Sequence, residues 1–181
     1  QVLHAEQALL PQGWQRDVRF TLRAGRIAAV ELGAIARPGD ERHALLLPGM
    51  PNLHSHAHQR GMAGMAEHRG PSTDSFWSWR ELMYRFALAM TPEQLEAIAS
   101  QLYVEMLEAG FTRVGEFHYL HHDGDGRPYA NPAEMAVRLG AAAERSGIGL
   151  TLLPVFYAHS SFGGAQAGDA QRRFTQGVDA Y

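Results

Sequence analysis

Two histidines separated by one residue, His54 and His56, are the side chains in this sequence that best suit metal chemistry. In a β-strand, side chains at positions i and i+2 project from the same face, so both imidazoles could reach one ion from a single strand end. Neutral imidazole is a good ligand for zinc and for similar ions. Without further context, such a pair is more often an incidental surface or core feature, so the surrounding elements decide.

The segments around the histidine pair favour a metal site. An apolar run at residues 44–47 leads toward the histidines, and Pro48, Gly49 and Pro51 stiffen the approach. A loop rich in glycine and methionine follows at residues 57–74. Folds of the α/β class place their sites where strands end in loops of this kind.

Helices and apolar strands alternate after this loop. Hydrophobic spacing, caps and glycine stops predict helices over residues 74–90, 91–109 and 131–147, and strands over residues 111–119 and 149–157. Asp74 or Ser75 is the expected cap of the first helix. Within this series, Thr91, Pro92 and Gln94 form a capping box with proline at the first helical position. Strands that are apolar almost throughout, alternating with helices, predict a parallel sheet with helices outside it.

The chain is expected to have two parts. Residues 1–45 read as strands of a small β domain, including a hairpin over residues 18–30. Residues 46–181 supply the first βα units and carry the histidine pair. Because a closed eight-stranded barrel needs roughly 200–250 residues, these units are either a small open sheet or the first part of an incomplete barrel.

Composition excludes several classes of protein. The 181 residues carry a formal net charge of −3, so no basic field would attract nucleic acid or anionic lipid. No stretch approaches the roughly 20 apolar residues of a membrane helix, and the first residues lack the pattern of an export signal. Cysteine is absent, which rules out thiolate ligands and suits a reducing cytoplasm.

Several blocks of sequence carry a family resemblance. Residues 47–60 resemble the first barrel strand of the amidohydrolase superfamily. The blocks 74–84, 114–121, 153–157 and 161–164 are similar to the formimidoylglutamate deiminases of histidine degradation, and the resemblance covers nearly the whole chain. The paired histidines are typical of the superfamily, whereas the tryptophan–arginine block at 77–80 and the block at 116–121 are much more specific.

The resemblance implies an α/β fold, the N-terminal portion of a (β/α)8 TIM barrel preceded by a small β-sandwich domain. It also implies a hydrolase acting on C–N bonds of linear amidines, which converts N-formimino-L-glutamate to N-formyl-L-glutamate and ammonia. The expected cofactor is one zinc ion per subunit, although histidine also accepts iron or manganese. The expected assembly is a cytoplasmic homodimer whose small acidic substrate is its only expected ligand besides the metal.

By the same resemblance, His54 and His56 are the metal ligands, and Gln59, Arg80 and Tyr119 contact the substrate. Arginine suits a substrate carboxylate because guanidinium offers a bidentate fork. No proton-transfer residue is expected within this chain. Those residues are expected beyond Tyr181, in a protein of roughly 450 residues that contains a complete barrel.

The sequence leaves two alternative functions undecided, and it leaves the roles of several histidines undecided. A deaminase of guanine or another aromatic base, and a non-catalytic metal-binding module, are the alternatives to the deiminase. We interpret His58 as a local variation rather than an additional ligand, and we expect Glu116 and His118 to serve buried hydrogen bonding more than direct chemistry. The sequence assigns no role to His121, His122 and His159.

Overall fold

The computed structural model describes residues 1–67 and 76–181, and it divides the chain into two compact units, Gln1–Gly49 and Met50–Tyr181. Each unit has its own sheet and its own buried core. The units are treated one at a time below.

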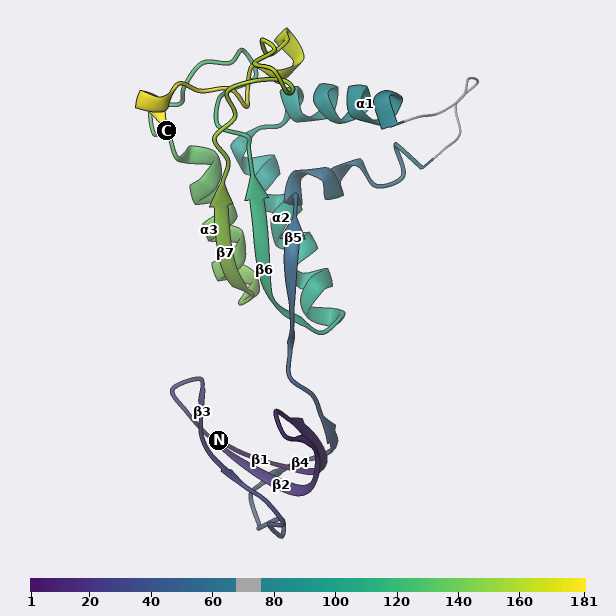
Figure 1. The fold of residues 1–181 in the computed structure, drawn as a ribbon. Coiled ribbons are helices and arrows are strands. Elements are labelled where there is room, and N and C mark those ends of the chain that lie inside the picture. The colour runs from purple at the N-terminus through teal and green to yellow at the C-terminus, as the bar shows by residue number, and fades with distance from the viewer. Residues whose placement is uncertain (68–75) are drawn as a thin grey trace. The chain divides into compact units, whose positions relative to one another are not determined.

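The first unit is a four-stranded sheet in the order β3-β2-β1-β4 (Figure 1). Its strands are β1 (Val2–Leu10), β2 (Gly13–Arg23), β3 (Arg26–Glu31) and β4 (Glu41–Leu46). The expected hairpin is present as the antiparallel pair β2–β3, and β1 also pairs with β4 in parallel. The small core comprises Ala5, Ala8, Val18 and Phe20.

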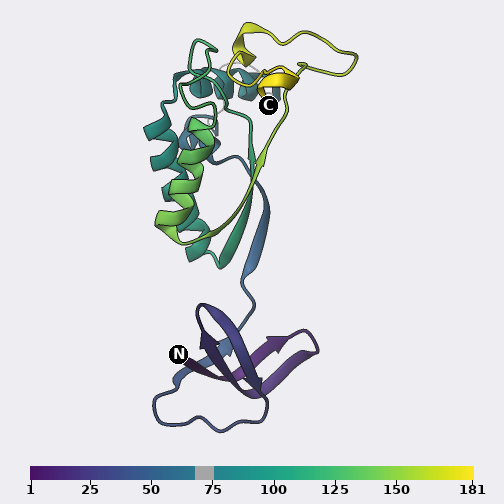
Figure 2. The same cartoon turned by 90° about the vertical axis from the view of Figure 1, so that its left-hand side faces the viewer.

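The second unit has a parallel three-stranded sheet in the order β5-β6-β7. Its strands are β5 (Met50–Ser55), β6 (Phe111–His118) and β7 (Gly149–Pro154). Helices α2 (Pro92–Glu108) and α3 (Glu134–Ser146) pack side by side along one face of this sheet (Figures 1 and 2). This arrangement of parallel strands with helices outside confirms the α/β fold expected from the sequence.

The remaining elements gather at the carboxyl ends of these strands. Helix α1 (Phe76–Ala89) lies there, where the arrowheads of β6 and β7 point (Figures 1 and 2). Three short 3-10 helices complete the unit: η1 (Ala57–Met62), η2 (Asp169–Gln171) and η3 (Val178–Ala180). The first of them occupies the start of the segment that the sequence predicts to be a loop. None of the helices in the described ranges is long and apolar enough to cross a membrane.

Local sequence signals explain where the helices begin. At α2, the Thr91 side chain accepts a hydrogen bond from the Gln94 amide at 3.2 Å, and the Gln94 side chain accepts one from the Thr91 amide at 3.0 Å. The predicted capping box is therefore confirmed. Helix α3 begins later than predicted because Asn131 accepts a hydrogen bond from the amide of Ala133, which forms a turn before the first helical residue. The predicted cap of α1, Asp74 or Ser75, lies outside the described residues.

Strand β7 is shorter than the predicted strand over residues 149–157. Its ladder with β6 ends where His118 pairs with Pro154, and a proline has no N–H to continue a ladder. Tyr157 instead forms an isolated bridge with Thr175. The chain therefore turns away from the sheet before the end of the apolar run.

The core of the second unit lies between the sheet and its helices, and it contains a fully buried arginine, Arg173. Its guanidinium donates hydrogen bonds to the main-chain carbonyls of Ala87, Met90 at 2.7 Å and His122 at 2.7 Å, and to the Tyr129 hydroxyl at 3.1 Å. Carbonyls at the end of a helix have no partner within the helix. Arg173 supplies those donors, so it joins the end of α1 to two loops.

Candidate metal centre

His54 lies at the carboxyl end of β5 and His56 follows the last strand residue, and their Nε2 atoms lie 3.0 Å apart. Two nitrogens that each lie about 2.0–2.1 Å from one zinc ion are separated by a distance of this order. His54 is exposed and His56 is half-buried, so the pair faces an accessible space. The donor atoms and their separation therefore fit two ligands of one metal ion.

The main chain of β6 fixes which nitrogen of His56 is available. The Nδ1 atom of His56 lies 2.9 Å from the carbonyl oxygen of Phe117, which can only accept a hydrogen bond. Nδ1 therefore carries the proton, and the lone pair of Nε2 points toward Nε2 of His54, where it can accept a hydrogen bond or bind a metal ion. Burial lowers the pKa of His56, and the hydrogen bond to Phe117 opposes that shift only in part. The net shift is downward, so the imidazole is neutral at neutral pH, as metal binding requires.

The Phe117 ring packs against both imidazoles. Its centroid lies 5.2 Å from that of His54 and 5.3 Å from that of His56. Glu116 and His118, its neighbours in β6, are both buried, 1% and 4% exposed. Since successive side chains of a strand point to opposite faces, the face of β6 that meets the histidine pair carries Phe117.

Gln59 and Tyr119 lie together near the histidine pair. The Gln59 amide donates to the Tyr119 hydroxyl at 3.2 Å, and the Tyr119 ring centroid is 5.1 Å from that of His56. The same hydroxyl lies 3.2 Å from Nε2 of His58. Burial lowers the pKa of His58 to about 3, so this imidazole is neutral and serves as a hydrogen-bond partner of Tyr119.

Arg80 stands on α1 and stacks on aromatic rings. Its guanidinium carbon lies 4.4 Å from the centroid of the Trp77 ring and 5.5 Å from that of Tyr84. No ion pair within the described ranges includes Arg80. Stacking orients the guanidinium plane while its N–H groups stay available for a carboxylate. No contact in the described ranges joins it directly to the histidine pair.

Comparison with known proteins identifies the family. Residues 45–180 match the amidohydrolase family, and residues 1–44 match the N-terminal domain of the formimidoylglutamate deiminase HutF. The chain belongs to the amidohydrolase family. It is 57% identical over 180 residues to a formimidoylglutamate deiminase of Pseudomonas aeruginosa, with 99% of this chain and 40% of that protein covered.

Solved structures of the family share the fold. An amidohydrolase from Brucella melitensis is 64% identical and superposes with a TM-score of 0.94, over 99% of this chain and 40% of that one. The atrazine chlorohydrolase TrzN from Arthrobacter aurescens, solved in complex with zinc, is 18% identical with a TM-score of 0.70 over the same shares. This amidohydrolase chain therefore spans about 40% of the length of the relatives it matches.

Two further histidines of the second unit, His121 and His122, secure loops. His121 Nε2 lies 2.9 Å from the carbonyl oxygen of Val155, and His122 Nε2 lies 2.9 Å from that of Thr175. His159 is exposed. Within residues 1–67 and 76–181, no group of three or more histidine, aspartate or glutamate side chains could hold a metal ion. His54 and His56 are therefore a pair without a third described ligand.

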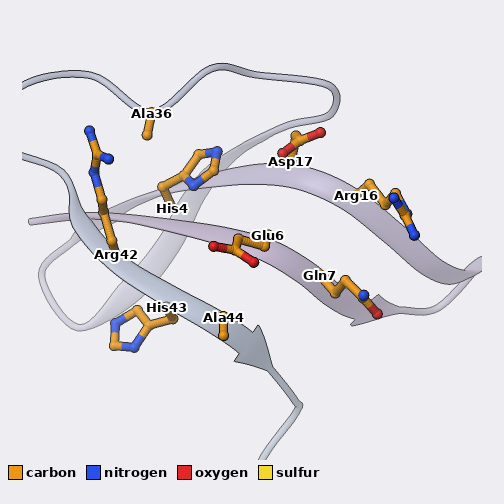
Figure 3. Close-up of a pocket in the computed structure, with 9 residues that line it drawn as sticks. All are labelled: His4, Glu6, Gln7, Arg16, Asp17, Ala36, Arg42, His43 and Ala44. Carbon is orange, nitrogen blue, oxygen red and sulfur yellow. The ribbon is translucent and has the colours of Figure 1, made fainter.

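A hollow of about 520 Å³ lies in the first unit, between β1, β2, β4 and the segment that contains Ala36 (Figure 3). Charged side chains line it, among them Glu6, Asp17 and Arg42. His4 also lines it and bonds through Nε2 to the carbonyl of Ala34 at 2.8 Å, which fastens that segment to β1. None of the residues that the sequence predicts for the site lies there.

Sequence reasoning missed three features of the amidohydrolase unit. The acceptor for His56 is a main-chain carbonyl, which any residue at position 117 would supply. The carboxyl group of Glu116 meets the segment that follows β5, which required knowledge of the strand register. Arg173 gave no signal because arginine is rarely buried. None of the three features has a local signal in the sequence.

Proposed function

We propose that this chain is the metal-binding part of an enzyme that hydrolyses N-formimino-L-glutamate to N-formyl-L-glutamate and ammonia in histidine degradation. The observation that carries the proposal is the 3.0 Å convergence of the Nε2 atoms of His54 and His56, with the proton of His56 held on Nδ1. The choice of substrate is supported by the 57% identical relative that bears the name formimidoylglutamate deiminase. The complete activity is proposed for a longer protein, because the chain spans 40% of that relative.

The proposed cofactor is zinc, held here by His54 and His56. A structural relative solved with zinc and the imidazole donors both support this choice, although iron and manganese accept similar ligands. Zinc sites have about four ligands, so further protein ligands would come from the part of the protein that this chain does not span. When bound, the metal would lower the pKa of its water toward about 7 and so supply a hydroxide nucleophile at neutral pH.

The chain's own residues would bind and orient the substrate. We assign Arg80 to a substrate carboxylate, because stacking on Trp77 holds its guanidinium as a flat bidentate donor. Gln59 and Tyr119 are hydrogen-bonded to each other beside His56, so they would contact the end of the substrate that carries the reacting C–N bond. The aromatic ring of Phe117 covers one side of the histidine pair and limits its access to water.

The test is turnover by the full-length protein. We expect ammonia release from formiminoglutamate, loss of activity after removal of the metal by a chelator, and recovery when Zn²⁺ is returned. Release from guanine at a comparable kcat/KM would favour the deaminase of aromatic bases instead. Tight metal binding without turnover of either substrate would favour the non-catalytic module.

The proposal also includes a homodimer, to be measured by light scattering, and a cytoplasmic location, to be measured by cell fractionation.

A further inference from the structure

The carboxyl group of Glu116 is buried next to the end of β5, where the histidine pair lies. Glu116 is 1% exposed, and its Oε1 atom accepts a hydrogen bond of 2.6 Å from the main-chain N–H of Ala57. Burying a carboxyl group is costly unless it has partners, and no ion pair within the described residues includes Glu116. Within residues 1–67 and 76–181, the one hydrogen bond of good geometry to this carboxyl group comes from Ala57, the residue that follows His56.

Glu116 also meets the residue that precedes His56. Ser55 is the register partner of Glu116 in the ladder. Burial raises the pKa of the Glu116 carboxyl group, and the Ala57 N–H and the hydroxyls of Ser55 and Tyr103 oppose that shift in part. Ser55 and Ala57 are buried, 8% and 0% exposed, and they alternate along the chain with the two histidines. The histidines therefore project from one side of the strand end, and Glu116 holds the residues that project from the other.

The position of Glu116 explains why the strand end needs this contact. The ladder between β5 and β6 ends where Ser55 pairs with Glu116. Beyond that pair, the amide of Ala57 has no strand partner, and the Glu116 side chain takes the place of the missing acceptor. The bond therefore extends the attachment of β5 to β6 past His56.

The residues on either side of Glu116 act on the same segment. At Gly115, a Cβ atom would lie 2.8 Å from the main-chain oxygen of Leu53, so only glycine allows the two strands this close approach. At Phe117, the carbonyl oxygen accepts the proton on Nδ1 of His56. Three consecutive residues of β6 thus contact the stretch that carries the histidines, and Glu116 is the one whose side chain accepts a hydrogen bond from the main chain of that stretch.

We propose that Glu116 is a positioning residue for the metal pair. Its carboxyl group holds the main chain of Ala57, just after His56, and its main chain pairs in the ladder with Ser55, just before His56. His54 and His56 are therefore held at metal-binding separation before the metal arrives. This inference rests on the proposed function, because it takes the two histidines to be metal ligands. Partners that orient ligands typically change metal affinity by about 10- to 100-fold, because they remove the cost of ordering the site during binding.

The experiment measures Zn²⁺ affinity in the full-length protein by competition with a chromophoric chelator. Glu116→Met removes the acceptor, Glu116→Gln keeps an amide oxygen for Ala57, and Leu139→Met is the matched control. Leu139 belongs to the same buried core, on α3, and its replacement by methionine conserves volume. We expect E116M to raise the dissociation constant by about 10-fold or more. The constants of E116Q and L139M should stay within about threefold of the original.

A purely structural role predicts a different result. E116M would then lower the thermal midpoint of the metal-free protein and leave the Zn²⁺ dissociation constant unchanged, which overturns the inference. If the unsubstituted protein binds no Zn²⁺, or if His54→Ala leaves its affinity unchanged, the proposed function itself fails instead. If E116M does not fold, hydrogen exchange at the Ala57 amide of the unsubstituted, metal-free protein tests the inference instead. Protection supports a preformed bond, and exchange at the rate of an unfolded chain overturns it.

Discussion

The Nε2 atoms of His54 and His56 lie 3.0 Å apart at the carboxyl end of β5, close enough to bind one ion. Replacing either histidine by alanine should reduce bound zinc in the full-length protein from about one ion per chain to about a tenth or less, because a mononuclear site tolerates few missing ligands. Elemental analysis after gel filtration measures this ratio. His43→Ala is the control, since that imidazole pairs with Glu41 in the first unit. A full complement of metal in either site variant would refute the assignment.

Arg80 should control substrate binding more than turnover. Replacing it by methionine removes a charged donor for a carboxylate, and a hydrogen bond to a charged group contributes about 1.5–3 kcal/mol. We expect KM for formiminoglutamate to rise about 10- to 100-fold, with a smaller change in kcat because the contact lies away from the bond that breaks. Steady-state kinetics with ammonia detection measure both. Arg85→Met, on the same helix, is the control, and an equal change in KM for both variants would contradict the assignment.

Arg173 should be essential for the stability of the second unit. Arg173→Met leaves the buried carbonyls of Ala87, Met90 and His122 without their donor, and each unsatisfied group costs about 1–3 kcal/mol. We expect the free energy of unfolding to fall by about 3 kcal/mol or more, measured by urea denaturation of the full-length protein. Arg127→Met, an exposed position nearby, should change it by about 0.5 kcal/mol or less. A loss at Arg173 no larger than that would disprove this role.

The ion pair between Arg60 and Glu105 joins η1 to α2, and its contribution to stability should be lost in acid. Two hydrogen bonds of 2.7 Å from the Arg60 guanidinium hold the pKa of Glu105 at about 2, below its usual 4.5. Because the folded-state pKa is the lower one, the pair stabilises the protein above pH 4.5, and this contribution is lost as the pH falls from 4.5 toward 2.

The thermal midpoint of the metal-free protein measures this effect. Glu105→Gln should lower the midpoint at pH 6, and the difference from the unsubstituted protein should shrink as the pH falls below about 4.5. Metal-free protein is needed because acid also protonates ligand histidines and releases metal. A difference that stays constant between pH 6 and pH 3 would show that the pair contributes nothing to the acid dependence.

Much of the fold follows from local sequence signals. The capping box at Thr91 and the apolar strands on either side of α3 predict the order of helices and strands in the second unit, and the spacing of His54 and His56 predicts that they share a face. These features depend on residues close together in sequence. A periodic pattern or a cap is therefore enough to recognise them.

The contacts between strands could not be predicted in the same way. Glu116 and His118 have the same spacing as the histidine pair, yet their strand presents Phe117 to that pair. A shift of one residue in register would exchange the two faces, and the sequence of one strand does not set its register against another. The partners of His56 and Ala57 both depend on that register, so they become visible only when the strands are placed side by side.

The hydrogen bond from His56 ends on the main chain of β6, and this has a consequence for how the protein can vary. A substitution at position 117 changes the ring that covers the histidines but keeps the carbonyl acceptor. A substitution at position 115 adds a Cβ atom that would lie 2.8 Å from the Leu53 oxygen and would push the strands apart. The tautomer of His56 is therefore insensitive to substitution at Phe117, whose carbonyl accepts the hydrogen bond. It is sensitive to substitution at Gly115, although the close approach there is to Leu53 rather than to the imidazole.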